Sequence, residues 1–268
     1  MKQSFNSYLI KNITAAKNAF LTKRTDKNDI QSFLKKLYPL YGNKELIRLG
    51  PKGDGGYLLP NDLMGIQACF SPGVSFESGF EKDCAELGMK VFLADKSVNG
   101  PAIEHELFNF TGKFIGAASN DDFMTLDNWV DSSVPGTNSD LLLQIDIEGY
   151  EYEVFQSASE SLMRRFRIIV AEFHELDQLW DNSFFKVADC VFDKILQTHS
   201  CVHIHPNNCS GVMQRDGFDI PEVMEFTFLR NDRIVNYSHQ RTFPNPLDYD
   251  NSTVKSALVL PKCWYSNE

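Results

Sequence analysis

The stretch that decides the fold is LLLQIDIEGYEYEVF, residues 141–155, in which a short apolar run leads through an acidic turn into an amphipathic segment. The run at 141–147 has the length and composition of a buried strand, and from Val154 to Leu162 apolar residues recur at helical spacing. A buried strand that leads directly into a helix is typical of a parallel α/β sheet. Asp146 interrupts the apolar run. A buried carboxylate is costly when bare, so it needs an ionic, hydrogen-bonding or metal partner.

The same alternation of strand-like and helical segments extends from about residue 46 to residue 230. The strand-like runs are residues 66–71, 89–94, 113–118, 141–147, 167–173, 201–205 and 224–230. The helical stretches between them are residues 76–87, 121–130, 150–166 and 184–198. Helices of this length join parallel strands, whereas the segment between His205 and Met224 has no helical period, so the last strand is expected to return antiparallel. The sequence predicts a doubly wound α/β sheet of seven strands with helices on both faces.

The chain on either side of this alternation is expected to be peripheral. Residues 1 to about 45 carry two groups of apolar residues at helical spacing: Phe5, Leu9, Ile13 and Ala16, then Ile30, Phe33, Leu34 and Leu37. We expect residues 1–45 to be a helical N-terminal extension outside the core and residues 46–268 to be the main domain. The tail after Asn231 is expected to be irregular surface chain.

The composition excludes several classes of function. The 268 residues carry 26 Lys plus Arg against 36 Asp plus Glu, a formal charge of −10, without a basic block. Double-stranded nucleic acid and anionic membranes require a basic footprint, so neither is an expected partner. The six cysteines are scattered without a CxxC pair, and the N-terminus lacks the apolar core of a signal peptide, so we expect a reducing, cytoplasmic location.

A glycine-containing turn follows the first strand. Ser71, Gly73 and Val74 lie where this turn enters a helix, and backbone N–H groups at a helix start can bind a cofactor. Asp95 follows the second strand, about 20 residues further on, where a carboxylate commonly accepts hydrogen bonds from a ribose. Together they indicate a nucleoside cofactor; an ordinary tight turn and a helix-capping aspartate would give the same pattern. The GxGxxG of NAD-dependent dehydrogenases is absent.

Carboxylates and imidazoles gather at the ends of the later strands, where ligands bind in an open α/β sheet. They are Asp146 after the fourth strand, Glu172 and His174 after the fifth, His203 and His205 on the sixth, and Glu225 on the antiparallel strand. We expect them to crowd one edge of the sheet. They would serve there as ligands of Mg²⁺, Mn²⁺ or Fe²⁺, or as a metal-free acid/base pair.

The segment RLGPKGDGGY, residues 48–57, contains four glycines, which permit a close approach of backbone to a ligand. It is not a P-loop, because GxxxxGK[ST] is absent. Lys52, Asp54 and Tyr57 are side chains that a loop touching a charged cofactor or substrate would offer. A flexible turn that enters the sheet is the alternative interpretation.

Several of these runs, taken in order, resemble the FkbM-type S-adenosylmethionine-dependent methyltransferases. They are RLGPKGDGGYLLP, LLLQIDIEGYEYEVF, AEFH, and HIHPNN followed by IPEVMEFTFLR, within residues 46–232. The resemblance implies the class I methyltransferase fold, a Rossmann-like seven-stranded sheet with an antiparallel last strand. It also implies contacts with the cofactor: Ser71, Gly73 and Val74 at its methionine end, Asp95 at the ribose, Asp121 or Asp122 near the adenine, and Asp146 facing the methyl group or a metal.

Many members of that family are thought to O-methylate sugars or polyketide-derived hydroxyls. The resemblance therefore implies a small acceptor such as a sugar or nucleotide-sugar. Removing the proton of its hydroxyl requires a base or a metal. We expect His174 to be the base, with His205 as second choice, or else a divalent metal held by Asp146, Glu172 and His174. The N-terminal helices offer a surface for a homodimer, for covering the active site or for docking on a larger assembly, and their pattern does not decide among these.

Two other functions fit parts of the pattern. A metal-dependent hydrolase would use the same carboxylates and imidazoles to activate water, and it would bind metal tightly while ignoring S-adenosylmethionine. A methyltransferase-like binding subunit is expected to have lost the acidic edge, whereas Asp146, Glu172 and His174 are all present.

Overall fold

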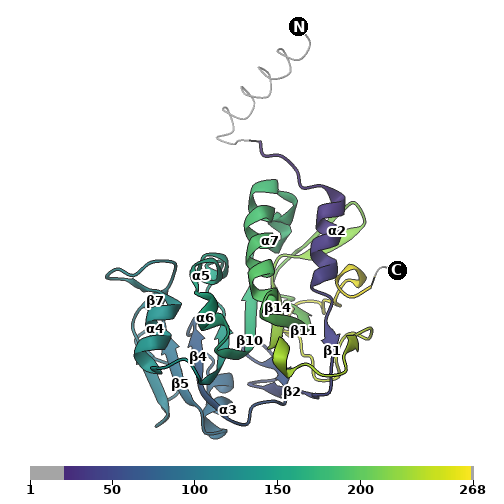
Figure 1. The fold of residues 1–268 in the computed structure, drawn as a ribbon. Coiled ribbons are helices and arrows are strands. Elements are labelled where there is room, and N and C mark those ends of the chain that lie inside the picture. Colours follow the sequence, from purple (N-terminus) through teal and green to yellow (C-terminus); the bar gives the residue numbers. More distant parts are fainter. Residues whose placement is uncertain (1–20, 267–268) are drawn as a thin grey trace.

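The computed structural model describes residues 21–266 and centres on a seven-stranded sheet (Figure 1). The strands lie in the order β11-β14-β10-β9-β4-β5-β6. Their bounds are β4 Ile66–Pro72, β5 Lys90–Ala94, β6 Phe108–Thr111, β9 Asp140–Ile145, β10 Phe166–Phe173, β11 His199–Pro206 and β14 Met224–Arg230. Neighbouring strands are parallel except β14, which pairs antiparallel with both β10 and β11. The prediction of a Rossmann-like sheet of seven strands with an antiparallel last strand is confirmed.

The third strand of the sheet lies elsewhere than expected. β6 pairs with β5, with Phe108 opposite Val91, whereas the predicted strand at 113–118 lies outside this sheet. Within that run, β7, Phe114–Ile115, pairs with β8, Phe123–Met124, in a separate two-stranded sheet. The run is apolar because Ile115 packs in the core and both β7 residues line a cavity. β6 is short and half-exposed, so it carries no strong apolar signal.

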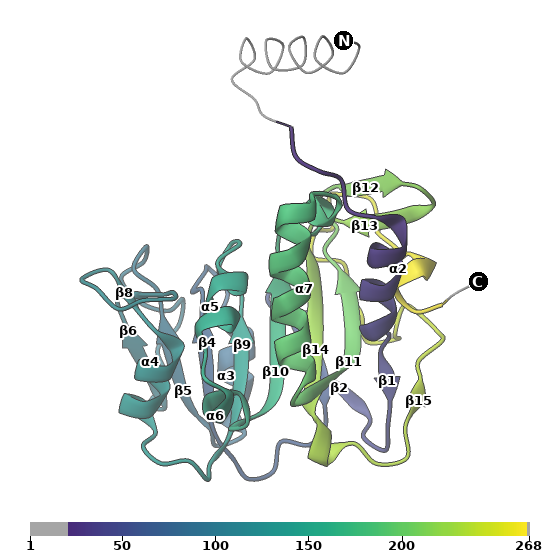
Figure 2. The ribbon, with the colours of Figure 1, turned by 45° about the horizontal axis from the view of Figure 1, so that its top comes forward.

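Side chains of the strands alternate between two faces and build two cores. On one face Phe70 and Leu143 pack with the helices α2 Lys27–Lys36, α4 Leu126–Ser133, α5 Glu151–Ser157, α6 Glu160–Met163 and α7 Asn182–Leu196. On the other face Cys69 and Leu142 pack with α3, Gly79–Glu86, and with the hairpin of β2 Leu46–Leu49 and β3 Tyr57–Pro60. Figure 2 shows α4, α5, α6 and α7 in front of the strands. The prediction of helices on both faces is confirmed.

Helix α2 belongs to the core, unlike the peripheral helix expected for residues 1–45. Ile30 and Phe33 are buried, and the Phe33 ring packs edge-on against Phe192 of α7 with centroids 5.2 Å apart. The expectation of a peripheral helix fails because apolar residues at helical spacing occur in any amphipathic helix. They do not distinguish a helix packed on the sheet from a helix that lies outside the core. The earlier apolar group, residues 5–16, lies outside the described residues. The domain boundary at residue 45 stays a prediction.

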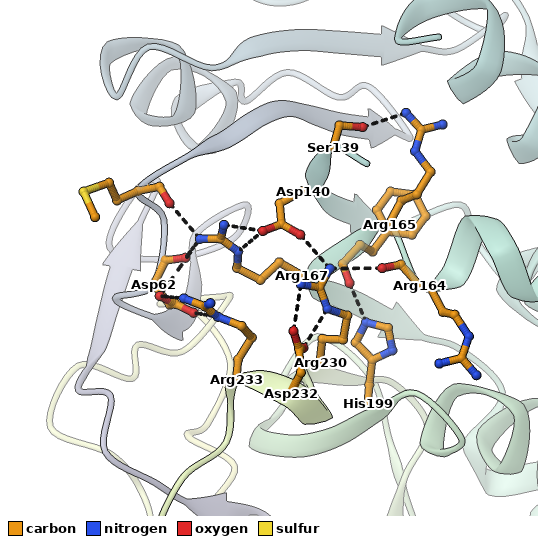
Figure 3. A network of polar contacts seen from close by, with 12 residues as sticks. Asp62, Ser139, Asp140, Arg164, Arg165, Arg167, His199, Arg230, Asp232 and Arg233 are labelled. Carbon is orange, nitrogen blue, oxygen red and sulfur yellow. Dashed lines mark hydrogen bonds and ion pairs between the residues drawn. The ribbon is translucent and has the colours of Figure 1, made fainter. Parts of the chain in front are cut away.

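A network of arginines and aspartates forms hydrogen bonds and ion pairs at the amino ends of the parallel strands (Figure 3). Arg167 Nε donates to Asp140 Oδ2 at 2.9 Å, and Arg230 Nη1 donates to Asp140 Oδ1 at 2.6 Å. Arg233 donates to both oxygens of Asp62 at 2.7 and 2.8 Å. Burial would raise the pKa of Asp140, but its hydrogen bonds with Arg167 and Arg230 hold it below the ordinary value. The polar side chains at the amino ends of the strands are therefore engaged with one another. A ligand is expected at the carboxyl ends instead.

The chain after β14 is largely exposed and irregular, as expected, but Leu260 and Trp264 are buried in the core. Trp264 is fully buried and contacts Phe226 of β14 with ring centroids 5.9 Å apart. The remaining short elements are β1 Leu40–Tyr41, β12 Val212–Arg215, β13 Phe218–Pro221, β15 Ser238–His239, η1 Leu176–Trp180, η2 Asn231–Arg233 and η3 Lys262–Trp264. β1 pairs with β15, and β12 pairs with β13. Within residues 21–266, no helix has the length and hydropathy required to cross a membrane.

Candidate active site

A cavity of about 350 Å³ opens at the carboxyl ends of β4, β5 and β9. Parallel strands bring these ends to one edge of the sheet, and the order of connections reverses at β4 and β9. Gly73, Val74 and Asp95, three of the predicted cofactor residues, line the cavity together with Asp146. The structure therefore brings these four residues around one space.

The turn after β4 requires glycine. Gly73 has a φ of +92°, and a β-carbon at this position would lie 1.6 Å from the carbonyl oxygen of Asp146. The N–H of Val74 donates to Asp95 Oδ2 at 3.0 Å, while Asp95 Oδ1 accepts from the Ser97 N–H at 2.6 Å and from its hydroxyl at 2.7 Å. Asp95 thus ties the turn to the end of β5 while it faces the cavity.

Ser71 lies in a buried polar network instead of on the cavity wall. Its Oγ is 2.5 Å from Glu81 Oε1 and 2.6 Å from Gln144 Oε1. Gln144 Nε2 donates in turn to the hydroxyl of Tyr57 at 3.3 Å. Burial raises the pKa of Glu81 above its ordinary value. Ser71 and Tyr57 therefore form hydrogen bonds within the packed interior, between the sheet and α3. Neither residue lines the cavity.

Aromatic side chains line the cavity on the side of β7 and β8. The ring centroids of Phe114 and Phe123 are 5.4 Å apart, and those of Phe123 and Tyr150 are 6.1 Å apart. The two acids predicted near an adenine, Asp121 and Asp122, are exposed, and Asp122 forms an ion pair with Lys96. The sequence analysis missed the aromatic wall. Its only signal was the pair of phenylalanines that flanks these acids.

The shape of the loop after β9 follows from the residues IEGYE. Glu148 and Gly149 have left-handed backbones, with φ of 56° and 99°, a conformation that glycine adopts far more readily than glutamate. Glu151, fully buried at the start of α5, accepts hydrogen bonds from the N–H groups of Ile147 at 2.8 Å and Gly149 at 3.0 Å. This carboxylate holds the loop in a tight turn and brings Glu148 close to His174.

Four acidic side chains surround His174, the residue after β10. Its Nε2 lies 3.5 Å from Glu148 Oε2, 3.8 Å from Asp146 Oδ1 and 4.0 Å from Glu172 Oε1. Its Nδ1 lies 3.3 Å from Glu151 Oε1. The three residues predicted as metal ligands, Asp146, Glu172 and His174, therefore do come together. Glu148, which was not predicted as a ligand, is the nearest carboxylate to Nε2.

The cluster holds its carboxylates where water solvates them poorly. Burial raises the pKa of Asp146 to about 7 and, together with the charge of Asp146, raises the pKa of Glu172 well above its ordinary value. Burial alone would lower the pKa of His174, but the neighbouring carboxylates, Glu151 foremost, raise it. Asp146 Oδ1 and Glu172 Oε2 are buried and have no hydrogen-bond partner within residues 21–266. The cluster is therefore short of positive charge and of donors.

A row of polar side chains extends from Glu172 across the antiparallel part of the sheet. Glu172 on β10 is in register with Glu225 on β14, and Glu225 is in register with His205 on β11, so the three lie side by side. Asn251 of the tail donates from Nδ2 to Glu225 Oε1 at 2.8 Å. Among the described residues, His205 Nε2 and Asn251 Oδ1 are buried without a hydrogen-bond partner. No motif pointed to Asn251.

The tail also orients the two histidines of β11. His203 Nε2 lies 2.9 Å from Asp248 Oδ1, and His205 Nδ1 lies 3.8 Å from Asp248 Oδ2. Burial would raise the pKa of Asp248, but the two histidines hold it well below its ordinary range. His203 is thereby engaged by the tail, whereas His205 keeps its Nε2 for another partner.

The glycine-rich loop at residues 50–56 joins this row through the tail. Arg48 braces the loop by donating from Nη2 to the carbonyl of Gly53 at 2.8 Å. Asp54 Oδ1 accepts from Asn251 Nδ2 at 3.3 Å, and the ammonium of Lys52 lies 5.5 Å from the centre of the Tyr249 ring. Lys52 and Asp54 do not line the 350 Å³ cavity. The structure places them on the side of Glu225 and His205.

Comparison with known proteins supports the resemblance seen in the sequence. Residues 87–199 match the family described as Methyltransferase FkbM domain. This stretch runs from the end of α3 to the start of β11 and includes Asp95, Asp146, Glu172 and His174. The curated proteins contain no match to the chain. Residues 87–199 are thus similar to the FkbM methyltransferase domain, and this stretch contributes most of the residues that line the cavity and surround His174.

Proposed function

We propose that the protein transfers the methyl group of S-adenosylmethionine to a hydroxyl oxygen of a small polyhydroxylated compound such as a sugar. The observation that carries this proposal is the position of Asp146, which lines the 350 Å³ cavity and lies 3.8 Å from His174 Nε2. One residue thus borders both the cavity and the acid/base cluster. Methyl transfer needs the acceptor oxygen in line with the methyl carbon. The acceptor oxygen and the methyl group would meet beside Asp146, between the cavity and the His174 cluster.

The residues around the cavity fit the parts of the cofactor. Phe114 and Phe123 offer apolar ring faces to an adenine, and Asp95 retains lone pairs for ribose hydroxyls beyond the bonds that it already accepts. The absence of a side chain at Gly73 lets the methionine end approach the backbone. When bound, the cofactor supplies an electrophilic methyl group. The protein's part is to hold it and to exclude water.

The cluster around His174 would remove the proton of the acceptor hydroxyl, which is a poor nucleophile while neutral. Glu151 faces the Nδ1 side of the ring at 3.3 Å and directs Nε2 toward Asp146 and the cavity. His174 therefore remains the first candidate for activation of the hydroxyl. His205 remains the second, because it lies beyond Glu172 and Glu225 in the row.

The acceptor would lie over the row formed by Glu172, Glu225 and His205, with Asn251 beside it. These side chains include buried, unpartnered atoms that can each take one hydrogen bond from a hydroxyl. Such a set suits a polyhydroxylated ring. Because the row is acidic, the ring itself would be uncharged, and the diphosphate of a nucleotide-sugar would have to lie toward Arg48 and Lys52.

Two measurements test this proposal. Calorimetric titration of the full chain with S-adenosylmethionine in the presence of EDTA should give micromolar binding. A transfer assay with methyl-labelled cofactor should then label neutral methyl glycosides or a nucleotide-sugar in a hydroxyl panel. Absence of cofactor binding would contradict the proposed chemistry. Binding with transfer to amines or thiols, and to no hydroxyl compound, would contradict O-methylation.

The hydrolase considered from the sequence is not proposed, because the matched family is one of methyltransferases. A homodimer and a cytoplasmic location stay predictions.

A further inference from the structure

The atoms around His174 Nε2 are spaced like the ligands of one ion. Two ligands of an octahedral ion with bonds of about 2.1 Å lie about 3.0 Å apart when adjacent and about 4.2 Å apart when opposite. The oxygens of Glu148 and Asp146 lie 3.5 and 3.8 Å from Nε2, between these two values, so a small shift of the side chains brings all three atoms onto one ion. Asp146, Glu148 and His174 each offer an atom within 4.8 Å of the other two. Hydrogen bonds would have drawn these atoms closer.

Two carboxylates of the cluster have buried oxygens that nothing in the described chain satisfies. Glu172 has a side chain only 5% exposed, its Oε1 accepts from Asn207 at 2.8 Å, and its Oε2 has no partner within residues 21–266. Asp146 Oδ1 is also buried and unpartnered there. Leaving a buried polar atom unsatisfied costs about 1–3 kcal/mol, and more when the group is charged. A cation held by Asp146, Glu148 and His174 would satisfy the Asp146 oxygen.

The other side of the imidazole has the arrangement found behind metal-binding histidines. Such a histidine usually presents its second ring nitrogen to a carboxylate, which sets the tautomer and the ring orientation. Glu151, fully buried, places Oε1 3.3 Å from His174 Nδ1 and is itself held by the N–H groups of Ile147 and Gly149. Nδ1 makes no hydrogen bond among the described residues, so the 3.3 Å contact with Glu151 acts through charge: it favours a proton on Nδ1, which would leave the Nε2 lone pair for an ion.

We propose that Asp146, Glu148 and His174 bind one divalent cation of the Mg²⁺ or Mn²⁺ class. Carboxylate oxygens with a single imidazole are the donors that these ions accept. As part of the proposed O-methylation, and resting on it, the site would hold the acceptor oxygen next to Asp146. His174 would act there as a ligand instead of a free base.

The site is tested by titrating the EDTA-treated full chain with Mn²⁺ and following free Mn²⁺ by electron paramagnetic resonance, without cofactor or acceptor. We expect one Mn²⁺ per chain with micromolar affinity, and competition by Mg²⁺. Glu148→Gln should weaken binding at least tenfold, a loss typical of a damaged metal site. Its side chain is 87% exposed, so this substitution leaves the fold intact. Glu153→Gln on α5 removes the same charge from another exposed glutamate and should bind Mn²⁺ like the parent chain.

The outcomes separate this inference from the proposed function. Failure to bind Mn²⁺, or equal binding by the Glu148 and Glu153 variants, overturns the metal site. If S-adenosylmethionine still binds in EDTA, the methyltransferase proposal survives such a failure, with His174 as the base. Binding of Mn²⁺ that is lost in Glu148→Gln supports the site even in a chain that does not bind the cofactor.

Discussion

The α-carbon of Gly73 faces the backbone carbonyl of Asp146 so closely that a β-carbon on residue 73 would lie 1.6 Å from that oxygen. The turn after β4 and the loop after β9 are thereby in contact at the edge where the cofactor cavity opens. Any side chain at residue 73 must push these two loops apart.

Replacing Gly73 by alanine is therefore expected to lower the affinity for S-adenosylmethionine by about tenfold or more. The new methyl group meets backbone, which cannot move aside cheaply, and the φ of +92° is strained for alanine. Calorimetric titration measures the effect. Gly100→Ala is the matched control, because a β-carbon there meets nothing within 4 Å. Equal affinities in the two variants would remove Gly73 from the cofactor site.

Phe123→Ala should also weaken cofactor binding. Stacking of a base on an aromatic ring contributes about 1–3 kcal/mol, so the dissociation constant should rise by about tenfold. Tyr237→Ala, at an exposed aromatic residue that does not line the cavity, should have no effect. Fluorescence or calorimetric titration with S-adenosylhomocysteine would check this without turnover. Unchanged binding by Phe123→Ala would place the adenine elsewhere.

His174→Ala should lower turnover by about 100-fold or more, because the imidazole activates the acceptor hydroxyl either as a ligand of the proposed cation or as the base, while cofactor affinity stays within about twofold of the parent chain. The ring lies behind Asp146 and does not line the cofactor cavity. Single-turnover transfer and calorimetry on the same preparation separate the two effects. Near-normal turnover would shift activation of the hydroxyl to His205.

His199 should make the stability of the fold depend on pH. Its Nε2 lies 2.8 Å from the carbonyl oxygen of Phe166 and its Nδ1 lies 2.7 Å from the hydroxyl of Thr198. A carbonyl only accepts, so Nε2 carries a proton. Burial, with the nearby charge of Arg230, lowers the pKa of His199 to about 4.

The unfolded chain, with an ordinary histidine pKa of about 6.5, binds the proton first as the pH falls. The contribution of His199 to stability is thus fully present above about pH 6.5 and is lost progressively toward pH 4, by about 2 kcal/mol between pH 7 and pH 5. Urea unfolding of the parent chain and of His199→Gln at these two pH values checks this. The variant should lose less stability than the parent over this interval, whereas the exposed His239→Gln should behave like the parent. Identical pH dependence in all three chains would contradict the assignment.

Much of the fold could be predicted because its signals are local. The strand β9, Asp140–Ile145, is largely apolar because both of its faces are buried, and the helix α7 repeats its apolar residues every turn, so each can be predicted from its own residues. The antiparallel last strand followed from the missing helix before Met224. β6 escaped detection since an edge strand that is half-exposed needs no apolar run.

The candidate site was predictable only in the part that lies on strand ends. Asp95, Asp146, Glu172 and His174 end or follow parallel strands, and the geometry of such a sheet brings them together. The aromatic wall depends on how β7 and β8 pair beyond the sheet, and the roles of Asp248 and Asn251 depend on where an irregular tail packs. Neither the aromatic wall nor the contacts of the tail produce a repeating pattern of apolar residues along the sequence, so the sequence did not reveal them.

By itself, the sequence determined the strands, their direction and the edge at which polar side chains collect, because burial and hydrogen bonding of a sheet impose regular patterns on neighbouring residues. Only the tertiary structure decided that Glu148 turns back to His174, that Glu151 stands behind the imidazole, and that Asn251 reaches Glu225. These contacts join segments through a left-handed turn, a buried capping carboxylate and a packed tail. The energies of these contacts depend on distances in space, and the number of residues between two side chains in the sequence does not give those distances.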